Sequence, residues 1–245
     1  MSGNQWLLGR DQPQARLRLY CFSHAGGNAA ACLHWQEQLG PGIALRAVQL
    51  PARGMRLQQP PYLSMAPLLR DLADVIAADL DGRPFAFFGH SLGALLAFEL
   101  ARTLYAEGRG QAERLILSGS AAPWLRTPPR RLHLLPDPEL VAALREMGGT
   151  PAAILAEPEL MAMLLPAIRA DFALVDSYRH QPGQPLPIPL TILAGRSDER
   201  TDSAGIAAWS DATSQGCAVH WFDGGHFFLH QQQDAVLACL RRCLS

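Results

Sequence analysis

A serine lies between two glycines in the segment FGHSLGALLAFELA, residues 88–101, and this spacing is suited to nucleophilic chemistry. Gly89, Ser91 and Gly93 complete the pattern G-x-S-x-G. In a nucleophile elbow of this type the serine lies on a strained strand-to-helix turn, and side chains at the flanking positions would collide with the neighbouring chain. Because glycine and serine also meet often in loops, an ordinary turn without chemistry is the alternative.

The elements around Ser91 favour the elbow. The apolar run FAFFGH, residues 85–90, is typical of a buried strand, and the leucine- and alanine-rich residues after Ser91 predict a helix that ends at Gly108. Ser91 is therefore expected at a strand-to-helix turn, the context that the motif requires. The backbone N–H of Leu92, at the start of this helix, is an expected donor to an oxyanion.

A serine hydroxyl is a weak nucleophile, so it needs a general base and an acid that orients the base. In hydrolases with this elbow the chain order is serine, acid, histidine. The strand-like run at 190–195 is followed by Asp198, Glu199 and Asp202, and Asp198 is favoured because it is nearest to the strand end. A turn aspartate that caps the next helix is the alternative role, and it suits Asp202 better.

The segment GGHFFLH supplies the expected base, His226, directly after its two glycines. His230 lies one helical turn further. Two histidines at i and i+4 can bind a metal, but the glutamate of H-E-x-x-H is absent and no third ligand is apparent, so no metal and no cofactor are expected. The other histidines near predicted strands, His24, His90 and His220, are expected to pack or cap, with His90 facing away from Ser91.

A second oxyanion donor is expected in the loop after an early strand. The loop CFSHAGGN, which follows a predicted strand at 17–24, has the flexible glycines that such a loop needs. The backbone N–H of Ala25 is the expected donor.

Short apolar runs and helical patterns alternate along the chain. This alternation predicts an α/β fold in which helices cover both faces of a mostly parallel central sheet. The predicted strands cover 17–24, 44–50, 85–90, 114–119, 190–195 and 218–225, and the predicted helices cover 64–80, 91–107 and 230–243, with Ser64 as a cap.

Residues 121–189 break this alternation, because they contain many prolines, no convincing strand, and helical patterns near 138–147 and 158–179. The strand pattern resumes at Leu190. We therefore predict a single domain, residues 1–245, with a helical lid inserted at approximately 121–189, over the carboxyl edge of the sheet where ligands of such folds bind.

Apolar residues of the predicted lid offer an adaptable surface for a substrate. Met161, Leu164 and Leu165 are the predicted substrate-binding residues, together with Met147, Leu155 and Met163. Packing of the lid on the sheet is the alternative role for them. The cluster of Arg126, Arg130 and Arg131 could contact an acidic partner, or it could be a solvated loop.

Composition excludes several other functions. The 245 residues are 49% hydrophobic, and a net charge of −1 with scattered basic residues argues against nucleic acid as a partner. All 21 basic residues are arginine, so chemistry that needs a lysine is impossible. The five cysteines lack C-x-x-C spacing, which argues against a disulfide framework and a zinc site. The chain shows no secretory leader or membrane-spanning run, which predicts a cytoplasmic protein without membrane contact.

Several segments together resemble the type II thioesterases of nonribosomal peptide and polyketide synthesis. They are FSHAGG, LPARGMR, FFGHSLGALLAFELA, LVAALREMGGTP, LLPAIRADF, YRH, LAGRSD and GGHFFL, and they extend from about residue 17 to the C-terminal end. The resemblance implies an α/β-hydrolase fold with a helical lid and a catalytic triad of Ser91, Asp198 and His226. Ser23 and Glu199 depart from the family pattern, which usually has proline at these two positions.

The resemblance also implies a function and a partner. Such enzymes remove acyl or aminoacyl groups from the phosphopantetheine arm of carrier domains and so regenerate mis-primed synthetases. Because the first strand is expected near residue 17, a stand-alone enzyme is favoured over a cyclising domain within a synthetase. A general carboxylesterase or lipase-like serine hydrolase and a non-catalytic carrier-binding module are the alternatives.

Overall fold

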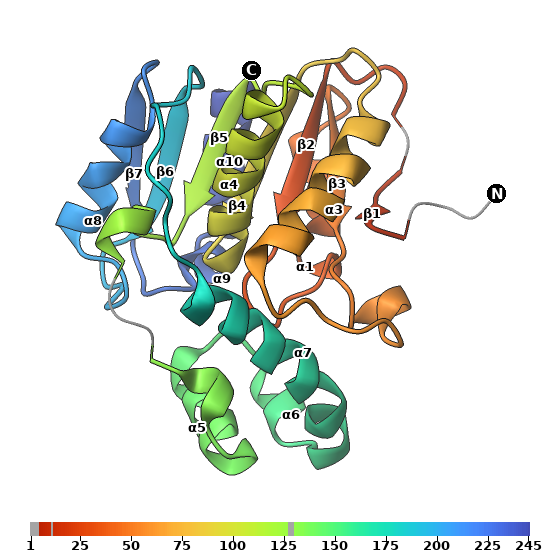
Figure 1. Cartoon of the computed structure of the whole chain (residues 1–245), viewed down its shortest axis with the longest axis vertical. Helices are drawn as coiled ribbons and strands as arrows, with labels where there is room; N and C mark the ends of the chain where they lie inside the picture. Colours follow the sequence, from red (N-terminus) through yellow and green to blue (C-terminus); the bar gives the residue numbers. More distant parts are fainter. Residues whose placement is uncertain (1–4, 11, 127–129) are drawn as a thin grey trace.

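A computed structural model describes residues 5–10, 12–126 and 130–245 of the chain (Figure 1). Its central sheet has seven strands in the order β1-β3-β2-β4-β5-β6-β7, and all neighbours are parallel except β1, which runs antiparallel to β3. The strands are β1 (Leu7–Leu8), β2 (Leu17–Phe22), β3 (Ile43–Val48), β4 (Phe85–His90), β5 (Arg114–Ser118), β6 (Leu190–Gly195) and β7 (Cys217–Phe222). The six predicted strands are confirmed; β1 is too short for a sequence pattern to reveal it.

Helices cover both faces of the sheet, as predicted. Along β2, Tyr20 and Phe22 face one core, whereas Leu19 and Cys21 face the other, because successive side chains of a strand point to opposite faces. The first core contains residues of α3 (Met65–Asp79), α4 (Leu92–Ala106) and α8 (Ser203–Ala207). The second contains residues of α1 (Ala30–Leu33), α2 (Trp35–Leu39), α9 (Phe228–Gln231) and α10 (Gln233–Leu244). Figure 1 shows α3 and α4 in front of the sheet and α10 behind it.

The observed helix ends differ from the predictions by a residue or two, with one larger difference. The helix predicted at 230–243 is divided at Gln232 into α9 and α10. Ser64 lies at the N-cap of α3, but its side chain makes no capping hydrogen bond. Short 3-10 turns complete the described chain at Gly54–Arg56, Pro123–Leu125, Leu132–Leu134 and Ala208–Ala212.

The described part of the segment between β5 and β6 contains three α-helices, α5 (Asp137–Met147), α6 (Ala152–Leu155) and α7 (Pro158–Ser177). We refer to residues 121–189 as the insertion. Its helices form a small core of their own, which contains Leu140, Leu144, Met161, Leu165 and Ile168. In Figure 1 these helices lie below the carboxyl ends of β2 and β5. None of the described helices has the length and apolar character needed to cross a membrane.

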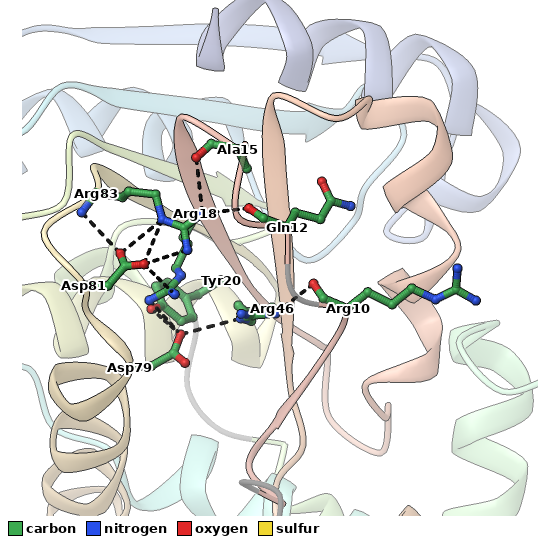
Figure 2. Close-up of polar contacts among 9 residues, drawn as sticks. All are labelled: Arg10, Gln12, Ala15, Arg18, Tyr20, Arg46, Asp79, Asp81 and Arg83. Atoms are coloured by element: carbon green, nitrogen blue, oxygen red, sulfur yellow. Dashed lines mark hydrogen bonds and ion pairs between the residues drawn. The ribbon is translucent and has the colours of Figure 1, made fainter.

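A network of charged side chains holds α3 against the sheet (Figure 2). The Tyr20 hydroxyl donates to Asp79 Oδ2 over 2.8 Å, and Arg46 Nε lies 3.6 Å from the same oxygen. Arg18 Nη2 donates to Asp81 Oδ2 over 3.0 Å. Arg18 and Arg46 are buried. Because a buried cation needs a nearby anion, these contacts fix the C-terminal end of α3 to β2 and β3.

Asp79→Asn is expected to lower the free energy of unfolding by about 1–3 kcal/mol, because it removes the negative charge beside Arg18 and Arg46. Asp74→Asn is the matched control on the same helix, since Asp74 is exposed and pairs with Arg109 on the surface. Its loss is expected to stay within about 0.5 kcal/mol. Urea unfolding of both variants measures the difference, and equal losses would contradict the role of Asp79.

Candidate active site

Ser91 lies on the turn between β4 and α4 with the strained backbone that an elbow requires. Its φ is 58° and its ψ is −111°. This conformation costs roughly 1–3 kcal/mol and persists only where its surroundings hold it. The Ser91 N–H donates to the carbonyl of Ser118 on β5 over 2.8 Å, which helps to hold the turn.

The two glycines of the motif are required by close approaches of the main chain. A Cβ atom on Gly89 would lie 2.0 Å from the carbonyl oxygen of Gly93, and a Cβ on Gly93 would lie 2.2 Å from the carbonyl oxygen of Phe22. Both distances are far below van der Waals contact. The steric reason predicted for these glycines is therefore present in the structure, and it brings α4 against the end of β2.

Asp198 and His226, which lie after β6 and β7, meet through a direct hydrogen bond. His226 Nδ1 lies 2.8 Å from Asp198 Oδ2, and the Arg200 N–H donates to Asp198 Oδ1 over 3.0 Å. Burial acts to raise the pKa of Asp198, but the hydrogen bonds and charge of His226 and the Arg200 N–H outweigh it, so the pKa is lowered. The other ring nitrogen of His226, Nε2, is buried and has no hydrogen-bond partner among the described residues.

Ser91 and His226 both line a cavity of about 160 Å³. Ser91, Ala25 and His226 line it from the sheet side, and Met147, Phe172 and Val175 line it from the insertion. Arg126, Arg130 and Arg200 also line the cavity, while Arg131 is exposed and does not line it. Asp198 lies behind His226, with its side chain fully buried.

The loop that carries Ala25 is held by an ion pair that sequence reasoning missed. Arg53 donates to both oxygens of Asp171 on α7, over 2.7 and 2.8 Å, and both side chains are almost fully buried. Asp171 Oδ2 also accepts from the Gly26 N–H over 2.7 Å, and Arg53 donates to the Gly27 carbonyl. The segments LPARG and RADF carry these residues, but nothing in the sequence indicates that they pair.

The two predicted oxyanion donors have N–H groups that are free within the described part of the chain. Among the described residues, the N–H groups of Ala25 and Leu92 donate to no backbone carbonyl.

Three further histidines surround His226. The rings of His90 and His226 lie 5.0 Å apart, and His90 Nδ1 lies 3.0 Å from Ser118 Oγ, so His90 packs beside His226, in agreement with the packing role predicted for it. Burial lowers the pKa of His90 well below its ordinary range, with a further contribution from His226. Burial and the neighbouring histidines lower the pKa of His24 to about 4. His230 is exposed and stacks on Phe227.

The three residues predicted to bind substrate lie outside the cavity lining. Met161 and Leu165 are buried in the core of the insertion, and Leu164 packs against that core, so none of the three lines the cavity. The amphipathic pattern reveals an apolar face but not the partner that covers it. Asp202 accepts from the Gly205 N–H over 2.6 Å and so caps α8, as predicted.

A nucleophile elbow on a mostly parallel sheet, with an acid and a histidine after later strands, defines the α/β-hydrolase class. Comparison with known proteins refines this class. A family model for the thioesterase domain matches residues 17–244. The type II thioesterase BorB from the borrelidin biosynthetic cluster superimposes with a TM-score of 0.92, at 36% identity over 100% of both chains. The chain therefore belongs to the thioesterase family.

Curated relatives agree with this assignment. Gramicidin S biosynthesis protein GrsT of Aneurinibacillus migulanus is 35% identical over 94% of this chain and 90% of its own. Linear gramicidin dehydrogenase LgrE of Brevibacillus parabrevis is 38% identical over 100% of this chain and 94% of its own. Its name describes a different activity, but the dinucleotide motif G-x-G-x-x-G is absent from the present sequence. The resemblance to type II thioesterases is confirmed, and the protein is a hydrolase.

Asp171→Asn is expected to lower the free energy of unfolding by about 3–5 kcal/mol, because it leaves the buried Arg53 guanidinium without its anion. It should also lower kcat, since the loop with Ala25 loses its anchor. Asp137→Asn is the control, because Asp137 joins α5 to Arg169 of α7 in an exposed pair and should contribute no more than about 1 kcal/mol. Denaturant unfolding and thioester hydrolysis at low temperature measure both effects; similar losses in the two variants would argue against an anchoring role.

Proposed function

We propose that Ser91, His226 and Asp198 form a catalytic triad that hydrolyses acyl or aminoacyl thioesters on the phosphopantetheine arm of carrier domains. The observation that carries this proposal is the 2.8 Å contact between Asp198 and His226, which fixes the imidazole in the cavity that Ser91 lines. The N–H groups of Ala25 and Leu92 form the proposed oxyanion hole.

The hydrogen bond to Asp198 selects the reactive nitrogen of His226. An ionised carboxylate only accepts hydrogen bonds, so Nδ1 carries the proton and Nε2 keeps its lone pair. Nε2 has no partner among the described residues, so it can accept the Ser91 proton. Ser91 Oγ then attacks the thioester carbonyl, and the two N–H groups stabilise the oxyanion. As the C–S bond breaks, the imidazolium gives its proton to the leaving sulfur, which departs as the thiol, and the acyl group stays on Ser91. Water, activated by the same imidazole, releases the acyl group from Ser91.

The names of relatives support a carrier-bound substrate. GrsT is named for gramicidin S biosynthesis, and BorB is a type II thioesterase of a borrelidin cluster. The AMB antimetabolite synthetase AmbE of Pseudomonas aeruginosa is 35% identical over 98% of this chain, which spans 11% of that protein. The family fold thus also occurs within a synthetase.

The cytoplasmic location expected from the sequence stays a prediction.

The insertion supports a lid role, because Met147 and Phe172 from its helices complete the cavity over Ser91. The cavity, about 160 Å³, is small compared with common ligand pockets and close to the roughly 150 Å³ that holds a benzene-sized group. This size favours short acyl groups.

Ser91→Ala and Asp198→Asn are expected to lower kcat by about 10⁴-fold each. Ser91→Ala removes the nucleophile, and Asp198→Asn removes the carboxylate that keeps the proton of His226 on Nδ1. Asp202→Asn is the matched control; the asparagine Oδ1 can still accept from the Gly205 N–H and cap α8, so this variant should keep both its stability and its kcat. Mass spectrometry of one acyl-carrier domain, before and after incubation, measures the reaction. If Asp202→Asn loses as much activity as Asp198→Asn, the assignment of the acid is wrong.

Two further assays test the alternatives. A carboxylesterase would hydrolyse p-nitrophenyl esters faster than acyl-pantetheine, and a non-catalytic module would leave Ser91 unlabelled by a fluorophosphonate.

Acyl carriers of increasing chain length should show a fall in kcat/KM beyond about six carbons, because longer chains exceed a benzene-sized cavity. Phe172→Ala should move this limit to longer chains, since Phe172 forms part of the wall. Trp221→Ala is the control, as Trp221 lies on β7 away from the cavity lining. A preference for one long chain in the unaltered enzyme would contradict the proposal.

A further inference from the structure

A second group of reactive side chains lies outside the cavity, between β7 and α10. His220, Cys239 and Cys243 each offer one ligand atom, and these atoms all lie within 4.8 Å of one another. None of the three residues lines the cavity beside Ser91. The proposed hydrolysis uses none of them.

The two elements present these side chains to each other for simple geometric reasons. Cys239 and Cys243 are four residues apart on α10 and therefore lie on one face of the helix. His220 is two residues from Phe222 on β7, so both side chains share a face of the sheet, and Phe222 packs against the core that contains Cys239. A histidine of the edge strand and two cysteines of the last helix thus face one another.

The donor set and spacing match those of a zinc site. Zinc prefers thiolate sulfur and imidazole nitrogen in a tetrahedron, whose donor atoms lie about 3.5–3.8 Å apart. The separations here are at most 4.8 Å, which exceeds this range by about 1.0–1.3 Å, and side-chain rotation can close that difference. Cys239 is buried, while His220 and Cys243 are half-buried, so water can reach the group.

We propose that His220, Cys239 and Cys243 bind one zinc ion, with water as the fourth ligand. Binding converts both thiols to thiolates, and their two protons pass to solvent, so affinity rises with pH. The ion joins α10 to β7, which is the outer strand of the sheet and pairs only with β6 among the described strands.

Chain spacing does not reveal this site, because His220 lies on a different element from the cysteines. The absence of C-x-x-C argues only against sites built from two cysteines three residues apart, and it does not bear on a pair at i and i+4 of a helix.

Cobalt(II) tests the proposal, because it reports thiolate ligation by an intense absorption. The full chain, first freed of metal with a chelator, should develop this absorption with one cobalt per chain, and zinc should displace it. Cys243→Ser and His220→Asn should weaken binding at least 10-fold. Cys217 is also a half-buried cysteine but lies on β7, and Cys217→Ser should leave cobalt binding unchanged. His226→Asn should also keep the absorption, which separates this site from the proposed triad.

Thermal unfolding gives a second readout. Zinc at about 100-fold above its Kd should raise Tm by roughly 5–10 °C in the unaltered chain and not in Cys243→Ser. No thiolate absorption with cobalt would overturn the proposal. Absorption that survives Cys243→Ser and disappears in Cys217→Ser would also overturn it, because the metal would then lie elsewhere.

Discussion

The left-handed backbone at Ser91 is the constraint on which the site depends. The turn from β4 into α4 is tight enough that any side chain at Gly89 or Gly93 would overlap main-chain atoms. This close approach places the first turn of α4 against the carbonyl of Phe22, at the end of β2. The loop after β2 therefore begins beside the serine. One steric condition brings together Ser91, the Leu92 N–H and the loop that carries Ala25.

The buried pair of Arg53 and Asp171 extends this arrangement to the insertion. Asp171 belongs to α7, yet it accepts from Gly26 and holds Arg53, which itself donates to Gly27. Phe172, the next residue, lines the cavity. A single helix of the insertion thus both anchors the loop after β2 and forms part of the wall over Ser91. Because an ion pair away from water is costly to break, this connection is stronger than the exposed pair of Asp137 and Arg169.

Burial also sets the charges around His226. It lowers the pKa values of His24 and His90, so both rings are neutral near neutral pH. They add no positive charge beside the imidazole on which the proposed mechanism places a proton. Asp198, whose pKa is lowered, stays ionised to balance that proton. The buried Arg18 and Arg46 balance their charges separately, against Asp79 at the end of α3.

Local patterns were enough to predict the strands, the main helices, the elbow at Ser91 and the order of Asp198 and His226, because periodicity and turn chemistry act over a few neighbouring residues. The cap at Asp202 was predicted for the same reason. Two-residue β1 and the four-residue α1 are too short to leave a periodic signal. The prediction that Met161 and Leu165 bind substrate rests on their apolar pattern, which does not show that they pack within the insertion and do not line the cavity.

The sequence by itself determined which residues could react and which elements would carry them. Tertiary structure alone decided that Arg53 meets Asp171 and that His220 faces Cys239 and Cys243. Partners far apart in the chain are chosen by how whole helices and strands pack, and that packing depends on all the buried surfaces together.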